Sequence, residues 1–505
     1  MQPQQIHPQR LFAGSCFALV STSVAFGVIT SNMDQFKEHF TLSNTQAGWI
    51  GGVTLWGFTL SIFALGPLVD AMGIKLQMRI AMLCHALGVL LMVAAGEMPQ
   101  PDSAMAFGAL FAGGLFIALG NGTVEAACNP LVATLYPDNK TTKLNQFHVW
   151  FPGGIVIGGL IAFLLDNTLF KGGGQVAGLS AWQVKLLVVL IPTVIYGILF
   201  LGQSFPRTER VESGVTFGQM FQAALKPLFI LMLLCMCLTA SLELGPGRWM
   251  GTAMNEVMAW AGDNAGILVL VYGTGLMAVL RFFAGPVVHR LAPTGVLLMS
   301  AVLAGLGLYL LSLVDAAALV FLAATVFFVG VCYFWPTMLG FVAERLPRTG
   351  ALGLALMGGT GMACVGLVTA PLMGAIGDEY VHRELVDRQA QVAQVLQASA
   401  LPEAEVVQQE LATSGALPKG ATADAIRSVI KAKESEALVA DARAIIEPAD
   451  AHGMRWGFRW TAVGAIPLVI IFGALFAYYR GRGGYKAERL GVQTPEAIPA
   501  AGAAD

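Results

Sequence analysis

The chain has 505 residues, of which 56% are hydrophobic and 12% are charged, whereas a soluble globular chain carries about 25% charged residues. This composition excludes a soluble globular protein and predicts an all-α integral membrane protein with many bilayer-spanning helices. The net charge of −2 gives no reason to expect a nucleic-acid partner.

Apolar stretches that approach or exceed the ~20 residues needed to cross a bilayer occur twelve times along the chain. The first lacks a convincing signal-peptide cleavage site, so we interpret it as a retained helix. The seven cysteines lie in apolar stretches, and we expect free thiols, no metal site and no cofactor. The predicted spans are 11–32, 46–69, 77–96, 104–135, 147–167, 183–203, 227–247, 263–286, 294–313, 317–342, 351–376 and 457–479.

Lys and Arg residues near the span ends are distributed unequally. With the N-terminus inside, fifteen fall on the cytoplasmic side and four on the opposite side. Because positive loops stay in the cytoplasm, we predict a multi-pass protein with both termini cytoplasmic. A bacterial inner membrane is our interpretation of its location.

The spans divide into two halves of six, and related strings stand at equivalent places in each. Gly66-Pro67 follows the second span and Gly285-Pro286 follows the eighth. Two such halves with a central site fit alternating access. The predicted domains are an N-terminal bundle (1–203), a cytoplasmic linker (204–226), C-terminal helices seven to eleven (227–376), an external helical insertion (377–456), helix twelve (457–479) and a cytoplasmic tail (480–505).

The insertion is polar and rich in Ala, Gln and acidic residues. Residues 382–400 and 421–446 are predicted helices, separated by Ser414-Gly415 and by 418–420. The simpler interpretation is an extramembrane segment with little function. The alternative is a cap over the external mouth or a docking surface.

Glu125 is the most informative single residue, because a charge at the centre of a spanning helix costs roughly 2.5–3.5 kcal/mol on insertion scales. Asn129 lies one helical turn further and shares its face. We predict that Glu125 loads and releases a proton or binds solute, with a structural carboxylate as the alternative.

A second polar string occurs in span seven, where Glu243 precedes Gly245-Pro246-Gly247 and Trp249. A broken helix is tolerated in a membrane where its backbone lines a cavity or is covered by protein. The carboxylate could accept from sugar hydroxyls and the indole could stack on the ring. The alternative is a Glu243–Arg248 pair at the external membrane edge.

Span five opens with Asn145 and His148, three residues apart on one face. Both are candidate solute or proton ligands, although a histidine at a helix end is often a structural hydrogen-bonding group. Trp56, Trp150 and Trp335 could stack on solute or simply pack.

The loop after the second span holds candidate gating residues, Gly66, Asp70 and Gly73. The acid could cap or pair with a neighbouring helix end and stabilise one access state, and Arg79 is its candidate partner. Arg281 lies late in span eight, and we expect its charge to pair near the cytoplasmic surface.

Residues Gly66 to Lys75 resemble the glycine–acid–basic loop of the major facilitator superfamily. Within it, the chain is similar to the fucose:proton symporter family in three strings, Phe40 to Gly48, Glu125 to Pro130, and Leu144-Asn145. The resemblance implies two six-helix bundles and a role for Glu125 in proton and sugar handling. The family also has an acid at the end of its first helix, where this chain has Thr30, with Asp34 four residues further.

The predicted function is therefore secondary transport of a small polar solute, a sugar, with proton symport across the lipid bilayer. The departure at Thr30 leaves an uncoupled facilitator open. Another solute such as an organic acid is a further alternative, although few buried basic residues are available to neutralise an anion. A transporter-like sensor with 377–456 as its partner-binding domain is a different class. No HExxH, GxSxG or P-loop string occurs, which disfavours an enzyme and ATP-driven transport.

Overall fold

The computed structural model describes residues 6–40, 42, 44–97, 103–170, 174–261, 266–432 and 434–491. Thr41 and Ser43 of the string from Phe40 to Gly48 lie outside these residues, as do the side chains of Asp34 and Arg248. The described part of the chain is α-helical, with a single isolated bridge between Val176 and Leu179 as its extended pairing.

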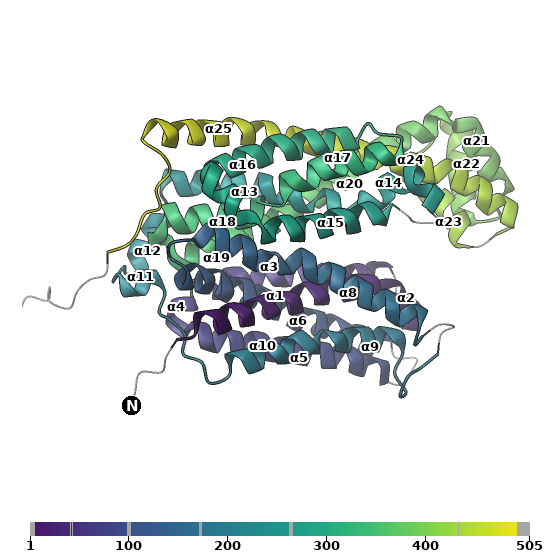
Figure 1. Cartoon of the computed structure of the whole chain (residues 1–505). Coiled ribbons are helices and arrows are strands. Elements are labelled where there is room, and N and C mark those ends of the chain that lie inside the picture. The colour runs from purple at the N-terminus through teal and green to yellow at the C-terminus, as the bar shows by residue number, and fades with distance from the viewer. Residues whose placement is uncertain are drawn as a thin grey trace, which may run out of the picture.

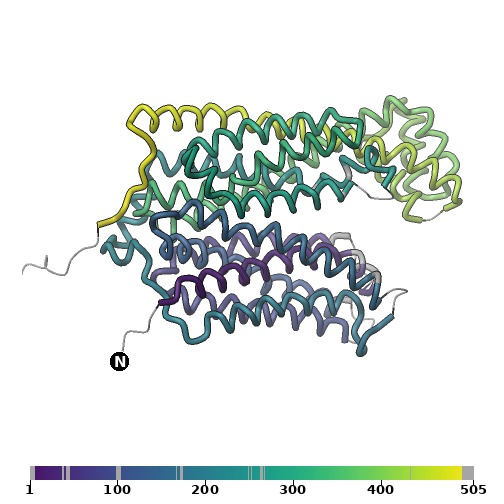
Figure 2. Tube along the Cα trace, viewed as in Figure 1, coloured from purple at the N-terminus to yellow at the C-terminus, as the bar shows by residue number. Residues whose placement is uncertain are grey.

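Two layers of helices lie one above the other in Figure 1, and the trace in Figure 2 shows that each comes from one half of the chain. The first half contains α1 (Pro8–Ser31), α2 (Met33–His39), α3 (Asn44–Leu65), α4 (Val69–Met72), α5 (Ile74–Ala94), α6 (Ser103–Leu135), α7 (Lys140–His148), α8 (Trp150–Asn167), α9 (Ala181–Val188) and α10 (Leu190–Phe200).

The second half follows a linker that forms α11 (Glu209–Glu212) and α12 (Phe217–Ala224). Its helices are α13 (Pro227–Leu244), α14 (Met250–Met258), α15 (Ile267–Phe282), α16 (Ala284–Leu311), α17 (Ala317–Val331), α18 (Phe334–Arg345), α19 (Gly350–Cys364), α20 (Ala370–Asp387), α24 (Glu436–Val463) and α25 (Ala465–Gly481), with a π-helical turn at Val365–Thr369 between α19 and α20.

Eleven helical stretches in the described residues are long and apolar enough to cross a membrane, and the shorter apolar helix Leu268–Phe282 stands where the eighth span was predicted. The prediction of an all-α, twelve-helix membrane protein is confirmed. Proline interrupts several of these stretches. Pro130 lies inside α6, where it cannot donate the backbone hydrogen bond of a helix interior, whereas Pro336 lies in the first turn of α18, where the amides have no partner within the helix.

Close helix packing depends on glycine. A Cβ on Gly307 of α16 would lie 2.2 Å from the Phe327 amide nitrogen, and one on Gly330 of α17 would lie 2.2 Å from the Ala304 amide nitrogen. These helices therefore approach each other closely enough that no side chain fits at the crossing.

The insertion between the last two spans forms α21 (Gln389–Ala398), α22 (Pro402–Ser414) and α23 (Ala421–Lys431). They share an apolar core with the ends of α20 and α24, which includes Leu385, Val407, Ile426 and Ile445. The helices α20 and α24 run without interruption across residues 377 and 456, where we placed the insertion's limits. The insertion is thus an outward continuation of two spanning helices.

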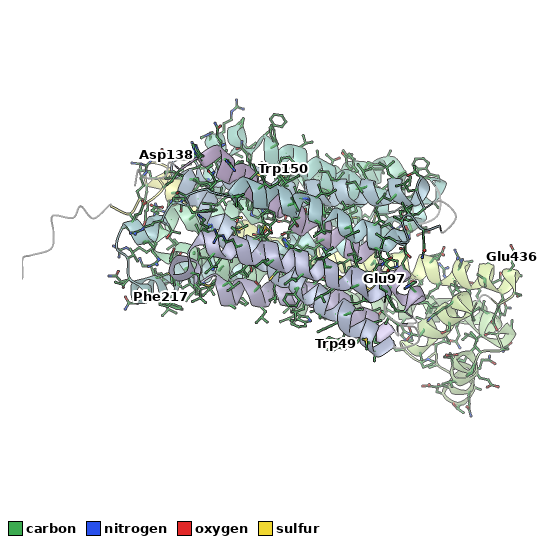
Figure 3. All side chains as sticks on the ribbon, turned by 90° about the horizontal axis from the view of Figure 1, so that it is seen from below. Trp49, Glu97, Asp138, Trp150, Phe217 and Glu436 are labelled. Carbon is green, nitrogen blue, oxygen red and sulfur yellow. The ribbon has the colours of Figure 1, made fainter. Side chains whose placement is uncertain are left out.

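The two ends of the molecule differ in what they carry. The Asp70 end holds α4, the linker helices and the start of α1, whereas the insertion end holds α21, α22 and α23 (Figure 1). In the side-chain view of Figure 3, Asp138 and Phe217 lie at the Asp70 end, and Glu97 and Glu436 lie toward the insertion end.

Direct contacts join the halves at the Asp70 end. The Thr141 amide and hydroxyl both donate to Glu344 Oε1, at 3.0 and 2.7 Å, and the Asn145 amide donates to Thr337 Oγ1 at 3.3 Å. The helix α3 also touches α19 there, because Gly66 lies directly against Ala355. These contacts close the Asp70 end.

Candidate solute site between the two halves

A small pocket lies between the two halves and is lined by residues of both. The open, non-atom space within it is about 380 Å³. Both halves contribute charged or polar groups to it within an apolar wall. The lining residues are Phe26, Phe58, Glu125, His148 and Phe151 from the first half, and Glu243, Leu244, Arg281, Trp335 and Met362 from the second.

Glu125 is part of a hydrogen-bonded chain within the first half. The residue is 6% exposed, and the Asn129 side-chain amide donates to Glu125 Oε2 at 2.6 Å. The Asn129 oxygen lies 3.0 Å from His148 Nε2. Because the NH₂ of Asn129 faces the carboxylate, this oxygen is the acceptor for an Nε2–H proton of His148. The predicted common face of Glu125 and Asn129 is confirmed.

Arg281 and Glu243 form a buried ion pair in the second half. Arg281 Nη2 lies 2.6 Å from Glu243 Oε1, and the side chains are 2% and 5% exposed. The other Arg281 donors reach the Cys332 carbonyl at 2.5 Å and the His148 carbonyl at 3.1 Å. Arg281 therefore connects the second half to the element that carries His148 in the first.

Glu243 also satisfies a helix end. The Trp335 amide donates to Glu243 Oε2 at 3.2 Å, at the first turn of α18. Amides at a helix N-terminus lack partners within the helix, and a carboxylate there is favourable. The broken end of α13 thus brings Glu243 to both a guanidinium and a helix N-terminus.

Two sequence-based expectations about pairing are wrong. We expected Arg281 near the cytoplasmic surface, but it reaches back into the pocket, where Glu243 neutralises its charge. We also expected Arg79 to pair with Asp70. Arg79 is exposed, and Asp70 instead accepts from Arg210 Nε at 2.6 Å and from Thr208 at 2.5 Å. Both partners lie on the linker, which curls back onto the loop.

Other candidates lie apart from the pocket. Asn145 is fully buried and donates to Thr337 and to the Thr141 carbonyl at 2.9 Å. Trp249 packs on the core of the second half, and Trp56 and Trp150 are 40% and 38% exposed. Of the four tryptophans considered, Trp335 lines the pocket. The alternative pairing of Glu243 with Arg248 involves the Arg248 side chain, which lies outside the described residues.

Sequence reasoning missed the contacts of the linker residues Thr208 and Arg210 with Asp70, and it missed the position of Arg281 in the pocket. The available signal for Arg281 was its position within an apolar span, where a cation needs an acid from a neighbouring helix. Glu243 was the corresponding acid in the adjacent span. The loop glycines have separate roles: Gly73 has φ 79°, a conformation that favours glycine, and Gly66 provides the contact with Ala355.

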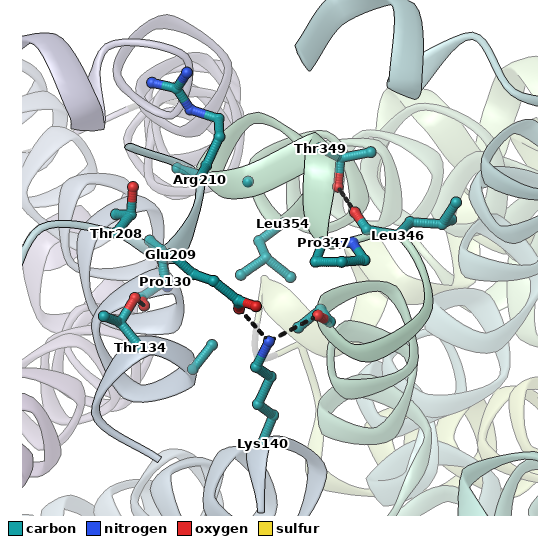
Figure 4. A pocket seen from close by; sticks show the side chains of 14 residues that line it. Pro130, Thr134, Lys140, Thr208, Glu209, Arg210, Leu346, Pro347, Thr349 and Leu354 are labelled. Atoms are coloured by element: carbon teal, nitrogen blue, oxygen red, sulfur yellow. Dashed lines mark hydrogen bonds and ion pairs between the residues drawn. The ribbon is translucent and has the colours of Figure 1, made fainter. Parts of the chain in front are cut away.

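A second hollow, shown in Figure 4, lies at the Asp70 end between the linker and the start of α19. Lys140 binds both Glu209 of the linker and the Ala343 carbonyl of α18, at 3.2 Å for the latter. Lys140 thus joins the first half to both the linker and the second half across this hollow. This arrangement suits a contact that holds the Asp70 end closed rather than a solute site.

The family model of the Major Facilitator Superfamily matches residues 12–377. The chain belongs to the Major Facilitator Superfamily. It is therefore an integral, multi-pass membrane protein whose family and fold are those of transporters and not of enzymes. The sequence-based prediction of this family and fold is confirmed.

Two curated relatives match shorter stretches of this superfamily member. The L-fucose-proton symporter of Escherichia coli (strain K12) is 31% identical over 130 residues, 25% of this chain and 28% of the relative. The cis,cis-muconate transport protein of Acinetobacter baylyi (strain ATCC 33305 / BD413 / ADP1) is 27% identical over 184 residues, 36% and 40% of the two chains. The matched stretches thus span well under half the length of either relative.

Solved structures of the superfamily share its fold. FucP in the outward conformation has a TM-score of 0.58 at 20% identity, covering 73% of this chain and 92% of the other. The proton:xylose symporter XylE bound to 6-bromo-6-deoxy-D-glucose also has a TM-score of 0.58, at 13% identity, covering 73% and 89%. At these identities the likeness concerns the fold.

Proposed function

We propose that this protein is a secondary transporter that moves a sugar across the membrane by alternating access, in symport with protons. The observation that carries the proposal is the pocket itself. It lies where the halves meet, it is closed at one end by direct contacts, and it contains a carboxylate from each half. Sites between two structural halves are where alternating access needs them.

The pocket's chemistry suits a neutral polyol ring. Hydrogen-bond acceptors and donors converge from Glu125, His148 and Arg281, while the Trp335 side chain offers a flat apolar surface. Small-solute sites combine an apolar wall with a few polar groups that fix orientation. A sugar has hydroxyls for the polar groups and an apolar ring face for the indole.

Glu125 is the proposed proton carrier. Arg281 is paired with Glu243, whereas the neutral side-chain amide of Asn129 donates a hydrogen bond to the Glu125 carboxylate. A carboxylate that is not directly paired with a cation is costly to charge inside a membrane, and proton binding removes that charge. Thr30, which stands where the resembling family has an acid, is exposed and donates to the Phe26 carbonyl at 2.9 Å, so it offers no carboxylate for this role.

The closed Asp70 end fits one state of the transport cycle. The Lys and Arg distribution supports a cytoplasmic location for that end. Under this orientation, which we propose together with a bacterial inner membrane, the molecule faces outward and its cytoplasmic exit is closed.

The deciding experiment is uptake of labelled monosaccharides into proteoliposomes, with and without an inward proton gradient. For wild type we expect accumulation against the sugar gradient. For Glu125→Gln we expect that accumulation to be lost while sugar exchange survives, because the neutral amide cannot release a proton. Glu436→Gln, an exposed acid in the insertion, is the matched control and should transport as wild type.

Three outcomes would contradict parts of the proposal. Equal uptake without a gradient would make the protein an uncoupled facilitator. Coupled uptake that survives in Glu125→Gln would move the proton to another group. An absence of transport for every sugar tested would remove sugars as the substrate class.

An organic acid is the second candidate, and Arg281 favours it. We expected few buried cations, yet Arg281 lines the pocket, and one relative carries the name cis,cis-muconate transport protein. Since Glu243 already neutralises Arg281, an anionic solute would have to displace this carboxylate or arrive with a proton. Including cis,cis-muconate and a saturated dicarboxylate in the same uptake panel separates the candidates.

A further inference from the structure

A second groove lies on the outer side of the second half, between α16 and the pair α24 and α25. Its open, non-atom space is about 1090 Å³. Small residues form the floor, where a Cβ on Gly305 would stand 2.6 Å from that of Ala465. The walls are apolar and exposed, with Leu306 at 49% and Ile466 at 58%. In a membrane, such a surface lies against lipid chains.

Polar groups gather at one end of this groove. Arg459 and Tyr309 line it there. The guanidinium donates to the Ser312 hydroxyl at 3.2 Å and to its carbonyl at 3.3 Å, and lies over the Trp456 ring at 4.2 Å. No carboxylate pairs with Arg459 among the described residues. Its neighbour Arg455, in contrast, pairs with Asp315 at 2.9 Å.

The polar end of the groove is at the level expected for the membrane surface. Trp456 and the exposed Trp460 lie beside Arg459 on α24, and such aromatic belts mark the boundary between lipid and water. From Arg459 to Ile470 the helices advance about 16 Å at ~1.5 Å per residue. This matches the depth of one leaflet, about half of the ~30 Å hydrocarbon core.

We infer that this groove binds one anionic phospholipid from the leaflet at the insertion end. One acyl chain lies along the floor between Gly305 and Ala465. The headgroup phosphate accepts from Arg459 and Tyr309. The unpaired cation selects a lipid with net negative charge, and the apolar length selects a chain rather than a free phosphate. This site is separate from the pocket and does not depend on the proposed function.

The test is native mass spectrometry of the full chain, delipidated in detergent and titrated with phosphatidylglycerol or with phosphatidylcholine of the same chains. We expect one tightly retained phosphatidylglycerol. Arg459→Gln should weaken its retention about fivefold, the equivalent of the ~1 kcal/mol that one Lys or Arg contributes near an anionic surface. Val302→Trp, at a 46% exposed wall position, should reduce retention of both lipids by filling the groove.

Matched controls test whether these effects belong to the groove. Arg290→Gln makes the same charge change at the opposite end of α16, and Leu322→Trp enlarges another exposed position on α17. Both should retain phosphatidylglycerol as wild type does. Because Arg459 also holds Ser312, thermal unfolding is measured in parallel, and Arg459→Lys, which keeps the charge, should retain more phosphatidylglycerol than Arg459→Gln.

Other results would overturn the inference. Equal phosphatidylglycerol retention by Arg459→Gln and Arg290→Gln would show that Arg459 does not bind the headgroup. Equal affinity of the wild type for both lipids would show that the groove does not select for charge. Binding of glycerol phosphate as tightly as the whole lipid would show that the acyl chain does not contribute. A dimer that Val302→Trp dissociates would make a second copy of this chain the occupant.

Discussion

Glu243 holds together groups that come from three places in the chain. Its two oxygens bind the Arg281 guanidinium and the Trp335 amide, and Arg281 in turn reaches the His148 carbonyl of the other half. A charge pair buried in this way is sensitive to the loss of one member, because the remaining charge stays buried without its hydrogen-bonded partner. The structural importance of Glu243 is therefore separable from any contact with solute.

We expect Glu243→Gln to destabilise the protein by ~3 kcal/mol, in the range for a buried pair that loses one partner. The measurement is the apparent Tm in detergent. Glu243→Gln combined with Arg281→Gln removes both charges and should recover part of the loss. A double variant that is less stable than either single variant would contradict this account of the pair.

At the scale of helices, the two related loops of the halves have unequal roles. Gly66 ends α3 against α19, and a Cβ there would lie 2.0 Å from that of Ala355. Gly285, at the corresponding place in the second half, has Thr142 as its neighbour, at an ordinary 3.6 Å. The closed Asp70 end therefore depends on the first glycine far more than on the second.

Gly66→Ala should shift the molecule toward a state that is open at the Asp70 end, since the added methyl group separates α3 from α19. Spin labels at Ala71 and Arg348, one exposed position in each half, would report this as a longer distance in pulsed electron resonance, with the native cysteines replaced. Gly285→Ala is the control and should leave the distance distribution unchanged. An unchanged distribution in Gly66→Ala would remove this contact as a determinant of closure.

For the whole molecule, the described end of the chain crosses from one half to the other. Tyr485 donates to Glu344 at 2.9 Å, and the Glu488 amide donates to the Glu344 carbonyl at 2.7 Å. Further along, Arg489 pairs with Asp138 of the first half. Residues 484–491 thus form a strap over the Asp70 end, joined to both halves.

Truncation after Gly483 should weaken closure of the Asp70 end by roughly 1–3 kcal/mol, since several hydrogen bonds of about 1 kcal/mol each are lost. The same spin-label pair measures the change in population. Truncation after Gly491 keeps the whole strap and serves as the control. If both truncations behave as the full chain, the strap does not contribute to closure.

Local pattern was enough to predict the twelve spans and the shared face of Glu125 and Asn129, because helix periodicity fixes both. Ion pairs were not predictable in this way. Arg281 and Glu243 are 38 residues apart, and Arg210 and Asp70 are 140 apart. Their pairing depends on how helices pack and on where the linker folds back. Arg79 was nearer to Asp70 in sequence, but its helix directs it outward.

The continuity of α20 and α24 into the insertion has a mechanical consequence. The ends of both helices share one apolar core with the three insertion helices, so the insertion must turn with the second half as one rigid body. A small rotation of the second half near the pocket then produces a larger displacement at the tip of the insertion, because the tip lies further from the axis of rotation. A fluorophore on that tip would record each turnover, and an antibody fragment that immobilised it would stall the cycle without approaching the pocket.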